Sequence, residues 1–466
     1  MTLAPTYPLS QPRFADADGA RPLTVIRAED WPALAQTHPQ AEWLLSSGFE
    51  AALGEVRLLP GPGGVIGAVA GLGTEKARRR QRFGLARAIA GLPAGAWRLE
   101  GDMTPAQREE AALAWLLQGY RFDRYRKSGT PGALLVAPQG LDQARLLAMA
   151  EGEYLTRDLV NTPAQDMGPA QLQAAFEALA ARHGTRVTTV LGQDLAQGFP
   201  MVHAVGQAAS PDRAPRIMEM RWGTEGPSLT LVGKGVCFDT GGLNIKPSSG
   251  MQLMKKDMGG SATVLGLAHM IMALGTKVRL RVIVPSVENA ISGNAMRPKD
   301  ILTSRKGLTV EVNDTDAEGR LILGDALAWA CEEPSDLLVS MATLTGAARV
   351  AVGPDLAPYY TDAAAVVAAL ETAAQQGFDP VWRLPFHDAY ESVIEPGIAD
   401  LDNAPGYGFA GSITAALFLR RFVDDRPYLH FDLYAHSPSD LPARPKGAVG
   451  QGARAVLGAL PTLLGV

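Results

Sequence analysis

Three carboxylates and an arginine lie close together in the segment VNDTDAEGR, residues 312–320. Asp314, Asp316 and Glu318 alternate along the chain, Arg320 follows, and the apolar stretch LILGDALAWA comes next. Like charges this close raise the free energy unless positive charge is supplied. An acidic turn in water is the simpler interpretation, and a metal site is the alternative. If the segment is extended, Asp316 and Glu318 point to the same side and offer two carboxylates to a cation.

A second segment, residues 229–264, supplies residues that would complete such a site. It reads LTLVGKGVCFDTGGLNIKPSSGMQLMKKDMGGSATV, in which Asp239 and Asp257 add carboxylates and Lys234 and Lys246 add positive charge. A Gly-Lys-Gly turn is by itself only a turn, and the spacing of a phosphate-binding loop is absent. Together the two segments predict a site for a hard divalent cation such as Mg²⁺ or Mn²⁺, or for Zn²⁺.

None of the seven histidines has the spacing of a metal ligand. There is no H-E-x-x-H motif, and His269 lies in an apolar helical pattern typical of a packed core residue. A metal ion would therefore be bound by carboxylates, with a lysine as a further candidate. The free pKa of lysine is about 10.4, so only a strongly positive neighbour such as the metal ion would make a lysine ligand neutral.

The alternation of strand and helix patterns predicts an α/β fold in two parts. We expect a small N-terminal α/β domain over residues 1–150, with oligomerisation as a candidate role. A larger catalytic α/β domain is expected over residues 151–466, with a central mixed sheet covered by helices. In the first part, strands are expected at 21–27, 54–60, 64–72 and 132–138, and helices at 75–92 and 104–120. In the second part, strands are expected at 186–191, 216–222, 229–235, 278–287, 308–312 and 336–344.

The composition is that of a globular protein in a reducing compartment. A net charge of −5 gives no sign of a nucleic-acid-binding surface. Two cysteines, Cys237 and Cys331, imply no disulfide framework. The first residues lack the features of a secretory signal, and no run reaches the ~18 apolar residues of a membrane span. We expect a cytoplasmic protein with neither a membrane nor a nucleic acid as partner.

The motifs VGKGVCFDTGGLNIKP and NDTDAEGRL resemble the leucyl (cytosol) aminopeptidase family of two-metal exopeptidases. The flanking segments 285–298, 341–347, 398–403 and 411–419 agree with the same family. The resemblance covers roughly residues 150–466 and is weak before them. The positions that carry it at consistent spacing are Lys234, Asp239, Lys246, Asp257, Asp316, Glu318 and Arg320.

The resemblance implies two divalent metal ions per subunit, Mn²⁺ or Zn²⁺. Lys234, Asp239, Asp257 and Glu318 would hold the tighter ion. Asp239, Asp316 and Glu318 would hold the more exchangeable ion, so that Asp239 and Glu318 would contact both.

The resemblance also implies hydrolysis of the N-terminal residue of short peptides by a water that bridges the two ions. Lys246 would contact the substrate and stabilise the oxyanion. Arg320 and the backbone of Leu344 would hold a bicarbonate that shuttles protons. An arginine suits an anion of that shape because its planar fork pairs with carboxylate-like groups, while its pKa is too high for a base.

The resemblance further implies where the substrate's first side chain would lie and how the chain would assemble. Met254, Thr343 and Gly346 would line the site for that side chain. The substrate would need a free N-terminus, because one ion would bind its amine. A homohexamer would be the expected assembly.

Two positions depart from the pattern of the family. Asp314 stands where many members have asparagine, which makes the local charge more negative. Tyr434 and His436 are bulkier and more polar than the small apolar residues that leucine-preferring members have in the pocket. The preferred side chain therefore stays open, and Tyr434 is as compatible with a packed aromatic residue as with a substrate contact.

Two other functions use the same features. A non-catalytic regulatory or nucleic-acid-binding protein could be built on the same fold, and a two-metal phosphatase or other hydrolase could use the same carboxylates. The complete set of catalytic positions argues against a non-catalytic protein, because a decayed enzyme should have lost a ligand. The candidate lysine ligand and the GGLNIKP loop favour the peptidase over the phosphatase.

Overall fold

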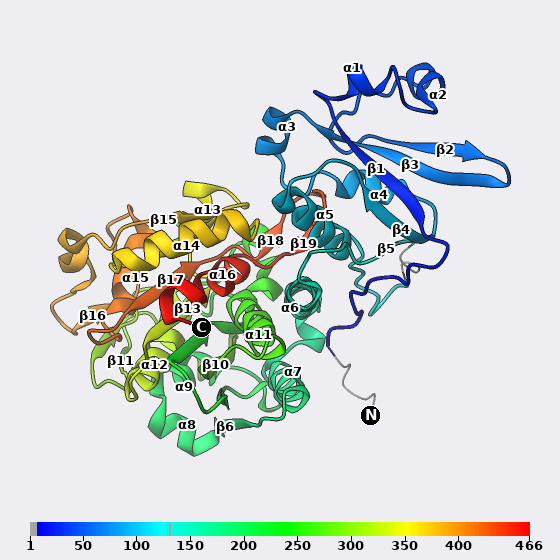
Figure 1. Ribbon diagram of the computed structural model, residues 1–466. Coiled ribbons are helices and arrows are strands. Elements are labelled where there is room, and N and C mark those ends of the chain that lie inside the picture. Colours follow the sequence, from blue (N-terminus) through cyan, green and yellow to red (C-terminus); the bar gives the residue numbers. More distant parts are fainter. Residues whose placement is uncertain (1–6, 128, 130–131) are drawn as a thin grey trace. The chain divides into compact units, whose positions relative to one another are not determined.

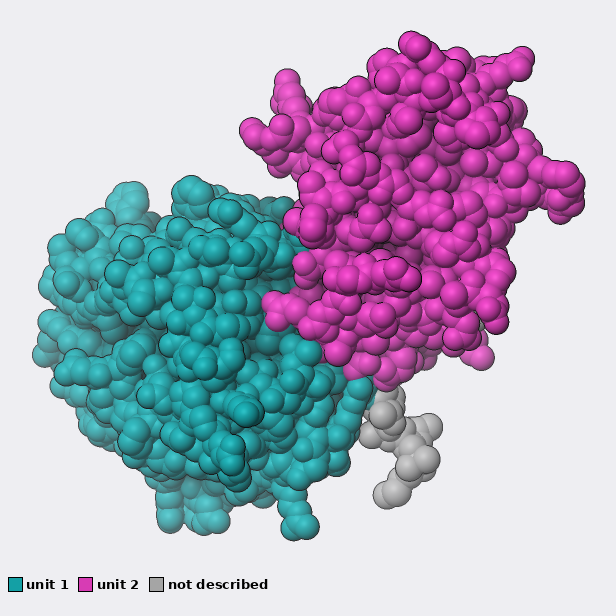
Figure 2. All heavy atoms as spheres, viewed as in Figure 1, with its two compact units in different colours: residues 1–8, 155–438, 447–466 teal, residues 9–154, 439–446 magenta. Residues whose placement is uncertain are grey.

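The computed structural model describes residues 7–127, 129 and 132–466, which form two compact units (Figures 1 and 2). The smaller unit comprises residues 9–154 and 439–446. The larger unit comprises residues 155–438 and 447–466, with Tyr7 and Pro8. Each unit has a mixed sheet with helices, so the predicted α/β fold class is confirmed. A division at residue 150 and a role of the first part in oligomerisation stay predictions.

The smaller unit is built on a five-stranded sheet, counted over the described residues, with the order β2–β3–β1–β4–β5. Only the β2–β3 pair is antiparallel. The strands are β1 (Arg21–Arg27), β2 (Val56–Gly61), β3 (Gly64–Gly73), β4 (Gly95–Glu100) and β5 (Ala133–Leu135). The helices are α1 (Trp31–Leu34), α2 (Ala41–Ser46), α3 (Glu75–Arg80), α4 (Ala86–Ala90) and α5 (Pro105–Gln118), and α6 (Gln143–Asn161) continues into the larger unit.

Local sequence signals explain part of this unit and mislead in another part. Helix α5 starts as predicted because Thr104 and Gln107 form a reciprocal capping box ahead of it. The continuous helix predicted over residues 75–92 is wrong, because the chain leaves the helical conformation between α3 and α4. Phe83 there has φ +57°, a left-handed backbone that interrupts a right-handed helix.

The larger unit is built on a nine-stranded mixed sheet, counted in the described part of the chain. The order is β15–β14–β17–β13–β8–β10–β7–β6, and β9 also pairs with β10. The strands are β6 (Val187–Leu191), β7 (Arg216–Trp222), β8 (Ser228–Gly233), β9 (Gly235–Asp239), β10 (Arg279–Asn289), β13 (Leu337–Ala342), β14 (Ala357–Tyr360), β15 (Val381–Arg383) and β17 (Tyr428–Asp432). Two smaller sheets contain β11 (Ile301–Thr303), β12 (Thr309–Glu311) and β16 (Leu401–Asp402), and β18 (His436–Ser437) and β19 (Gly447–Ala448).

Helices alternate with many of these strands along the chain (Figure 1). Apolar side chains make α11 buried almost throughout, as expected for a helix in the core of a large unit. The helices are α7 (Pro169–Arg182), α8 (Gly192–Gly198), α9 (Pro200–Gly206), α10 (Ser248–Met251), α11 (Gly259–Ala273), α12 (Glu318–Cys331), α13 (Gly346–Val352), α14 (Ala364–Gln376), α15 (Gly411–Arg420) and α16 (Ala453–Leu464). Short 3-10 helices are η1 (Ala164–Asp166), η2 (Pro211–Arg213), η3 (Met254–Lys256) and η4 (Asp388–Ile394).

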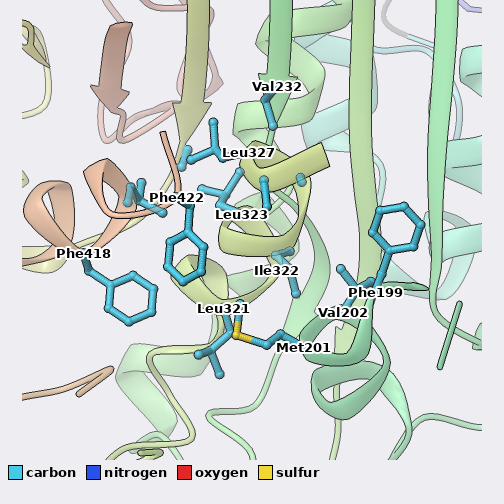
Figure 3. Packing of buried hydrophobic residues seen from close by; sticks show 14 of the residues in the cluster. Phe199, Met201, Val202, Val232, Leu321, Ile322, Leu323, Leu327, Phe418 and Phe422 are labelled. Atoms are coloured by element: carbon cyan, nitrogen blue, oxygen red, sulfur yellow. The ribbon is translucent and has the colours of Figure 1, made fainter. Parts of the chain in front are cut away.

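Helix α12 is held on several sides by buried apolar residues. In Figure 3 its leucines and Ile322 lie between the Phe199–Val202 segment and the aromatic pair Phe418 and Phe422. Asp325, in the middle of α12, accepts hydrogen bonds from the backbone N–H groups of Met201 and Val202 at 2.8 and 3.2 Å. Close packing of this kind allows little movement, so the first turn of α12 has a fixed place in the unit.

Two further expectations concern His269 and the membrane. His269 is buried in α11, and its Nδ1 lies 3.0 Å from Nε2 of His183, as expected of a packed core residue. Within the described residues, none of the helices combines the length and the apolar character that a membrane crossing requires.

Candidate metal centre and active site

The candidate residues gather where central strands end and where α12 begins. Lys234 stands between β8 and β9, and Asp239 is the last residue of β9. Both strands pair in parallel with β10, which ends at Asn289, and Glu318 is the first residue of α12. The carboxyl ends of parallel strands are where α/β proteins commonly place ligand sites. The topology thus brings two segments about 80 residues apart in sequence to the same edge of the sheet.

Lys234 is the centre of one set of contacts. Its Nζ lies 2.7 Å from Oδ2 of Asp257 and 3.1 Å from Oε1 of Glu318, and it donates to the carbonyl of Thr343 at 2.8 Å. The Thr343 hydroxyl donates to Oδ1 of Asp257 at 2.8 Å. Burial alone would lower the pKa of Lys234, but Asp257, Glu318 and Asp239 together raise that pKa above its usual value.

Lys246 is the centre of a second set. Its Nζ lies 2.9 Å from Oδ2 of Asp239 and 2.5 Å from Oδ1 of Asp316. The other oxygen of Asp239 accepts hydrogen bonds from the backbone of Gly241 at 2.8 Å and from Nδ2 of Asn289 at 2.9 Å. Gly241 has φ +87°, and a Cβ atom on it would lie 2.5 Å from the carbonyl oxygen of Asn244, so the tight loop after β9 requires glycine.

Three carboxylates converge between the two lysines. Asp239, Asp316 and Glu318 bring ligand atoms within 4.8 Å of one another. Burial and then Asp239 raise the pKa of Asp316 to about 7, and the same two causes raise the pKa of Glu318 well above its usual value. Neither oxygen of Glu318 accepts a hydrogen bond from a described residue, although Oε1 is within ion-pair distance of Lys234. This donor set fits a divalent cation, which would relieve the repulsion and occupy the buried oxygens.

The acidic segment is not extended, which was the condition under which Asp316 and Glu318 would point to the same side. Thr315 and Asp316 form a turn, and Glu318 already belongs to α12. The backbone N–H of Asp316 donates to Oδ1 of Asp314 at 2.8 Å, a local side-chain turn that aspartate and asparagine both support. Asp314 therefore shapes the turn, and the condition of an extended segment is not met.

Arg320 follows Gly319 in the first turn of α12 and is buried. It forms no ion pair among the described residues, and its Nε has no hydrogen-bond partner there. Burial lowers the pKa of Arg320 to about 10, while Asp432 and Glu318 act in the opposite direction. The guanidinium is thus positive at neutral pH and still has donors available for an anion.

The backbone amide of Leu344 is not free to bind a bicarbonate. Its backbone N–H donates to Oδ1 of Asp432 at 3.1 Å. Asp432 also accepts hydrogen bonds from Thr345 and from the hydroxyl of Ser412 at 2.8 Å. The amide of Leu344 is therefore already bound, and only its carbonyl remains for a contact with an anion's O–H group.

The three residues expected to line the substrate site lie in different surroundings. Met254 is half-buried in η3, and its carbonyl accepts a hydrogen bond from the backbone of Asp257. Thr343 is buried and contacts both Lys234 and Asp257. Gly346 is exposed at the start of α13, and a Cβ atom on it would meet nothing within 4 Å.

Several residues that hold the site together were missed by sequence reasoning. Asn289 donates to Asp239 and also to the carbonyl of Thr315 at 3.1 Å. The Thr315 hydroxyl bonds to Asn244 and to the carbonyl of Gly241, which joins the two loops. Asn403 donates to the carbonyls of Asp314 and Ala317 at 2.7 and 3.3 Å. Asn289 and Asn403 lie in flanking segments that carry the resemblance, but their spacing alone gave no reason to single them out.

The fold and the site together define a class of metal-dependent hydrolases that use carboxylates in place of histidines. The chain belongs to the cytosol aminopeptidase family, because the pattern of that family's catalytic domain matches residues 154–457 and the pattern of the M17 aminopeptidase N-terminal domain matches residues 21–138. It is accordingly a metallopeptidase of the aminopeptidase type, as the resemblance predicted.

Individual relatives agree with this assignment. A probable cytosol aminopeptidase from Chelativorans sp. is 38% identical over 391 residues, which are 78% of each chain. The crystal structure of the cytosol aminopeptidase from Coxiella burnetii is similar with a TM-score of 0.92 at 39% identity, over 97% of this chain and 99% of that one. The bottromycin maturation enzyme BotP in complex with Mn is similar with a TM-score of 0.87 at 30% identity, over 96% and 99% of the two chains.

Proposed function

We propose that this protein releases the N-terminal residue from short peptides with the help of two divalent metal ions. The main support is the convergence of the Asp239, Asp316 and Glu318 carboxylates within 4.8 Å, flanked by two buried or half-buried lysines. Lys234, Asp239, Asp257 and Glu318 would hold one ion, and Asp239, Asp316 and Glu318 the other. The manganese in the related BotP complex supports Mn²⁺, with Zn²⁺ as the alternative.

The electrostatics of Lys234 set a condition on its role as a ligand. Only a neutral lysine can donate a lone pair, yet its carboxylate neighbours raise the pKa of Lys234. A divalent ion bound to the same carboxylates would reverse their effect and favour the neutral amine. Bound divalent ions supply Lewis acidity, which polarises a carbonyl and lowers the pKa of water towards neutrality.

Lys246 would stabilise negative charge that develops on the substrate. Its ammonium group bridges Asp239 and Asp316 at the edge of the carboxylate cluster, and its side chain keeps 14% of its exposure. It is thus the lysine that a substrate can reach, whereas Lys234 is enclosed at 3%. A donor aimed at an oxyanion typically accelerates such a reaction ~10²–10³-fold.

Arg320 would hold a bicarbonate that moves protons. Its guanidinium is positive and has donors unoccupied by other described residues, which suits a planar, carboxylate-like anion. Because the amide of Leu344 is bound to Asp432, we assign to Leu344 at most a contact through its carbonyl. Met254, Thr343 and Gly346 would lie beside the first side chain of the substrate.

The test is hydrolysis of amino-acid p-nitroanilides by the full chain after chelation and reloading with Mn²⁺ or Zn²⁺. We expect turnover of unblocked substrates, none after chelation, and none with an N-acetylated substrate. Failure to cleave any unblocked substrate with metal loaded would refute the proposal. Turnover of phosphate esters instead would favour the two-metal phosphatase, and binding of DNA in a gel shift without peptidase activity would favour the non-catalytic alternative.

We also propose a homohexamer and a cytoplasmic location. The first extends the family's usual assembly to this chain, and the second extends the description of the relatives as cytosol aminopeptidases. Light scattering coupled to size-exclusion chromatography measures the assembly directly. A monomer or dimer at micromolar concentration would contradict the hexamer.

A further inference from the structure

Lys256 is a buried cation that forms no ion pair with any described residue. It lies in η3, two residues after Met254, and its residue is only 8% exposed. Its side chain makes no hydrogen bond and no ion pair with any described residue. Its Nζ lies 5.0 Å from the centroid of the Tyr434 ring. A cation–π contact stabilises a cation, but burying an ammonium group without a counter-ion still costs free energy.

A second cation contacts the same ring. Cζ of Arg349 lies 5.2 Å from the centroid of Tyr434, and its side chain likewise has no ion pair among the described residues. Arg349 belongs to α13 and is exposed, so this side of the cluster is open to solvent. Lys256, Arg349 and Tyr434 therefore form a positively charged cluster in which neither cation has an ion pair with a described residue, and the carboxylates of Asp257 and Asp432 act on Lys256 only from a longer distance. We call these three residues the Tyr434 cluster.

The Tyr434 cluster adjoins the residues proposed for the substrate's first side chain. Lys256 shares η3 with Met254, and Arg349 lies three residues after Gly346 in α13. Tyr434 precedes Ala435, which lies close to Gly259. A Cβ atom added to Gly259 would be 2.5 Å from Cβ of Ala435 and 3.1 Å from Cγ2 of Thr343. Ala435, the residue after Tyr434, and Thr343, which contacts Asp257, thus both lie close to Gly259.

We propose that Lys256, assisted by Arg349, selects peptides whose N-terminal residue carries a side-chain carboxylate, glutamate or aspartate. The inference rests on the proposed function, because it assumes that the first side chain lies beside Met254 and Thr343. A carboxylate there supplies the ion-pair partner that Lys256 and Arg349 both lack, and hydrogen bonds between charged groups are stronger than those between neutral groups. An N-terminal lysine or arginine side chain adds a third positive charge and is disfavoured. A leucine side chain leaves Lys256 buried without a counter-ion.

The test compares substrates that differ only in their first side chain. Glutamate and glutamine have the same shape, so the ratio of their kcat/KM values isolates the charge. With metal-loaded, full-length protein we expect glutamyl p-nitroanilide to exceed glutaminyl p-nitroanilide on the order of 10-fold or more, and lysyl p-nitroanilide to be the poorest. A ratio of one or below in the unmodified protein would overturn the proposal.

Two substitutions test whether the Tyr434 cluster causes the difference in kcat/KM between the glutamyl and glutaminyl substrates. Lys256→Met removes the charge and keeps the length of the side chain, and the Glu:Gln ratio should fall to about one, mainly through a higher KM for the glutamyl substrate. Arg349→Gln changes an exposed residue with little risk to folding and should lower the ratio by a smaller factor. An unchanged ratio in both variants would show that the cluster only packs against Tyr434.

The matched control is Lys277→Met, which makes the same change elsewhere. Lys277 is exposed and precedes β10 at the end of the strand opposite to Asn289, so both rates and ratio should stay as in the unmodified protein. Leucyl p-nitroanilide reports on the proposed function independently of the ratio. If no substrate were hydrolysed, calorimetric binding of Glu-Ala and Gln-Ala dipeptides would still measure the preference, and equal affinities would refute it.

Discussion

A Cβ atom on Gly319 would lie 2.4 Å from Cε and 2.6 Å from Nζ of Lys234. Because Gly319, in the first turn of α12, has no side chain, it leaves room for the side chain of Lys234. Lys234 cannot easily withdraw, because it is buried and held by Asp257, Glu318 and the carbonyl of Thr343. The motif needs glycine at this position because of Lys234, which lies between β8 and β9, far from Gly319 in the sequence.

Gly319→Ala should therefore displace the Lys234 amine and reduce both bound metal and activity. In a helix without this contact, alanine would be more favourable than glycine by ~1 kcal/mol. Here the clash makes the substitution unfavourable, because three atoms of Lys234 lie under 3.0 Å from the added carbon. Metal content by mass spectrometry and p-nitroanilide hydrolysis measure the effect. Gly293→Ala, where the added carbon meets nothing within 4 Å, is the control and should behave as the unmodified protein.

Glu318→Gln should lower metal content and activity together. The carboxamide keeps the shape of Glu318 but offers only one oxygen to a metal ion and carries no charge, so it is a poor ligand for either ion. The loss of activity should exceed the roughly 10- to 100-fold effect of residues that only support a ligand. Glu332→Gln, on an exposed residue just after the other end of α12, is the matched control. Full activity of Glu318→Gln with both ions bound would contradict the ligand assignment.

Arg320→Ala should slow turnover, on the order of 10²-fold, with little change in metal content. The guanidinium has no ion pair among the described residues, so its removal breaks no partner contact of the carboxylate cluster. Arg320→Lys keeps a positive charge but loses the planar fork and should restore only part of the rate. Added bicarbonate should stimulate the unmodified protein more than Arg320→Ala. Equal stimulation of both proteins would exclude Arg320 as the anion holder.

Asp325→Ala should destabilise the protein by about 1–3 kcal/mol, because buried N–H donors lose their acceptor. Asp325 accepts from the backbone of Met201, Val202 and Arg305 and so joins α12 to two other segments. The midpoint of thermal unfolding measures the loss. Asp336→Ala is the control, since Asp336 accepts from Ser228 at an exposed position where water can replace it. A larger shift in the control would show that burial is not the cause.

The candidate site shows where local sequence is informative and where it is not. The alternation of Asp314, Asp316 and Glu318 would place carboxylates on one side of an extended segment, but a turn and a helix start bring the same carboxylates together. The spacing identified residue types that suit a cation, but it did not specify the backbone conformation that brings them together. The difference arises because Asn403 and Asn244 hold the segment from loops far away in sequence.

Other elements show the same limit. The capping box of Thr104 and Gln107 is local, so α5 could be predicted from sequence. The break at Phe83 and strand β4, which lies between β1 and β5 in the sheet, were not predicted from local patterns. The partners of Asp239 illustrate the point within the site, because Asn289 reaches it only through the parallel pairing of β9 and β10.

The sequence by itself determined the α/β class, the family and the set of carboxylates and lysines, because motif residues are close in the chain and their chemistry is in their side chains. Only the tertiary structure decided that Gly319 makes room for Lys234, that the amide of Leu344 belongs to Asp432, and that Lys256 and Arg349 meet at Tyr434. These relationships join residues 85 to 178 positions apart in the numbering. They follow from strand order and helix packing, which no local pattern specifies.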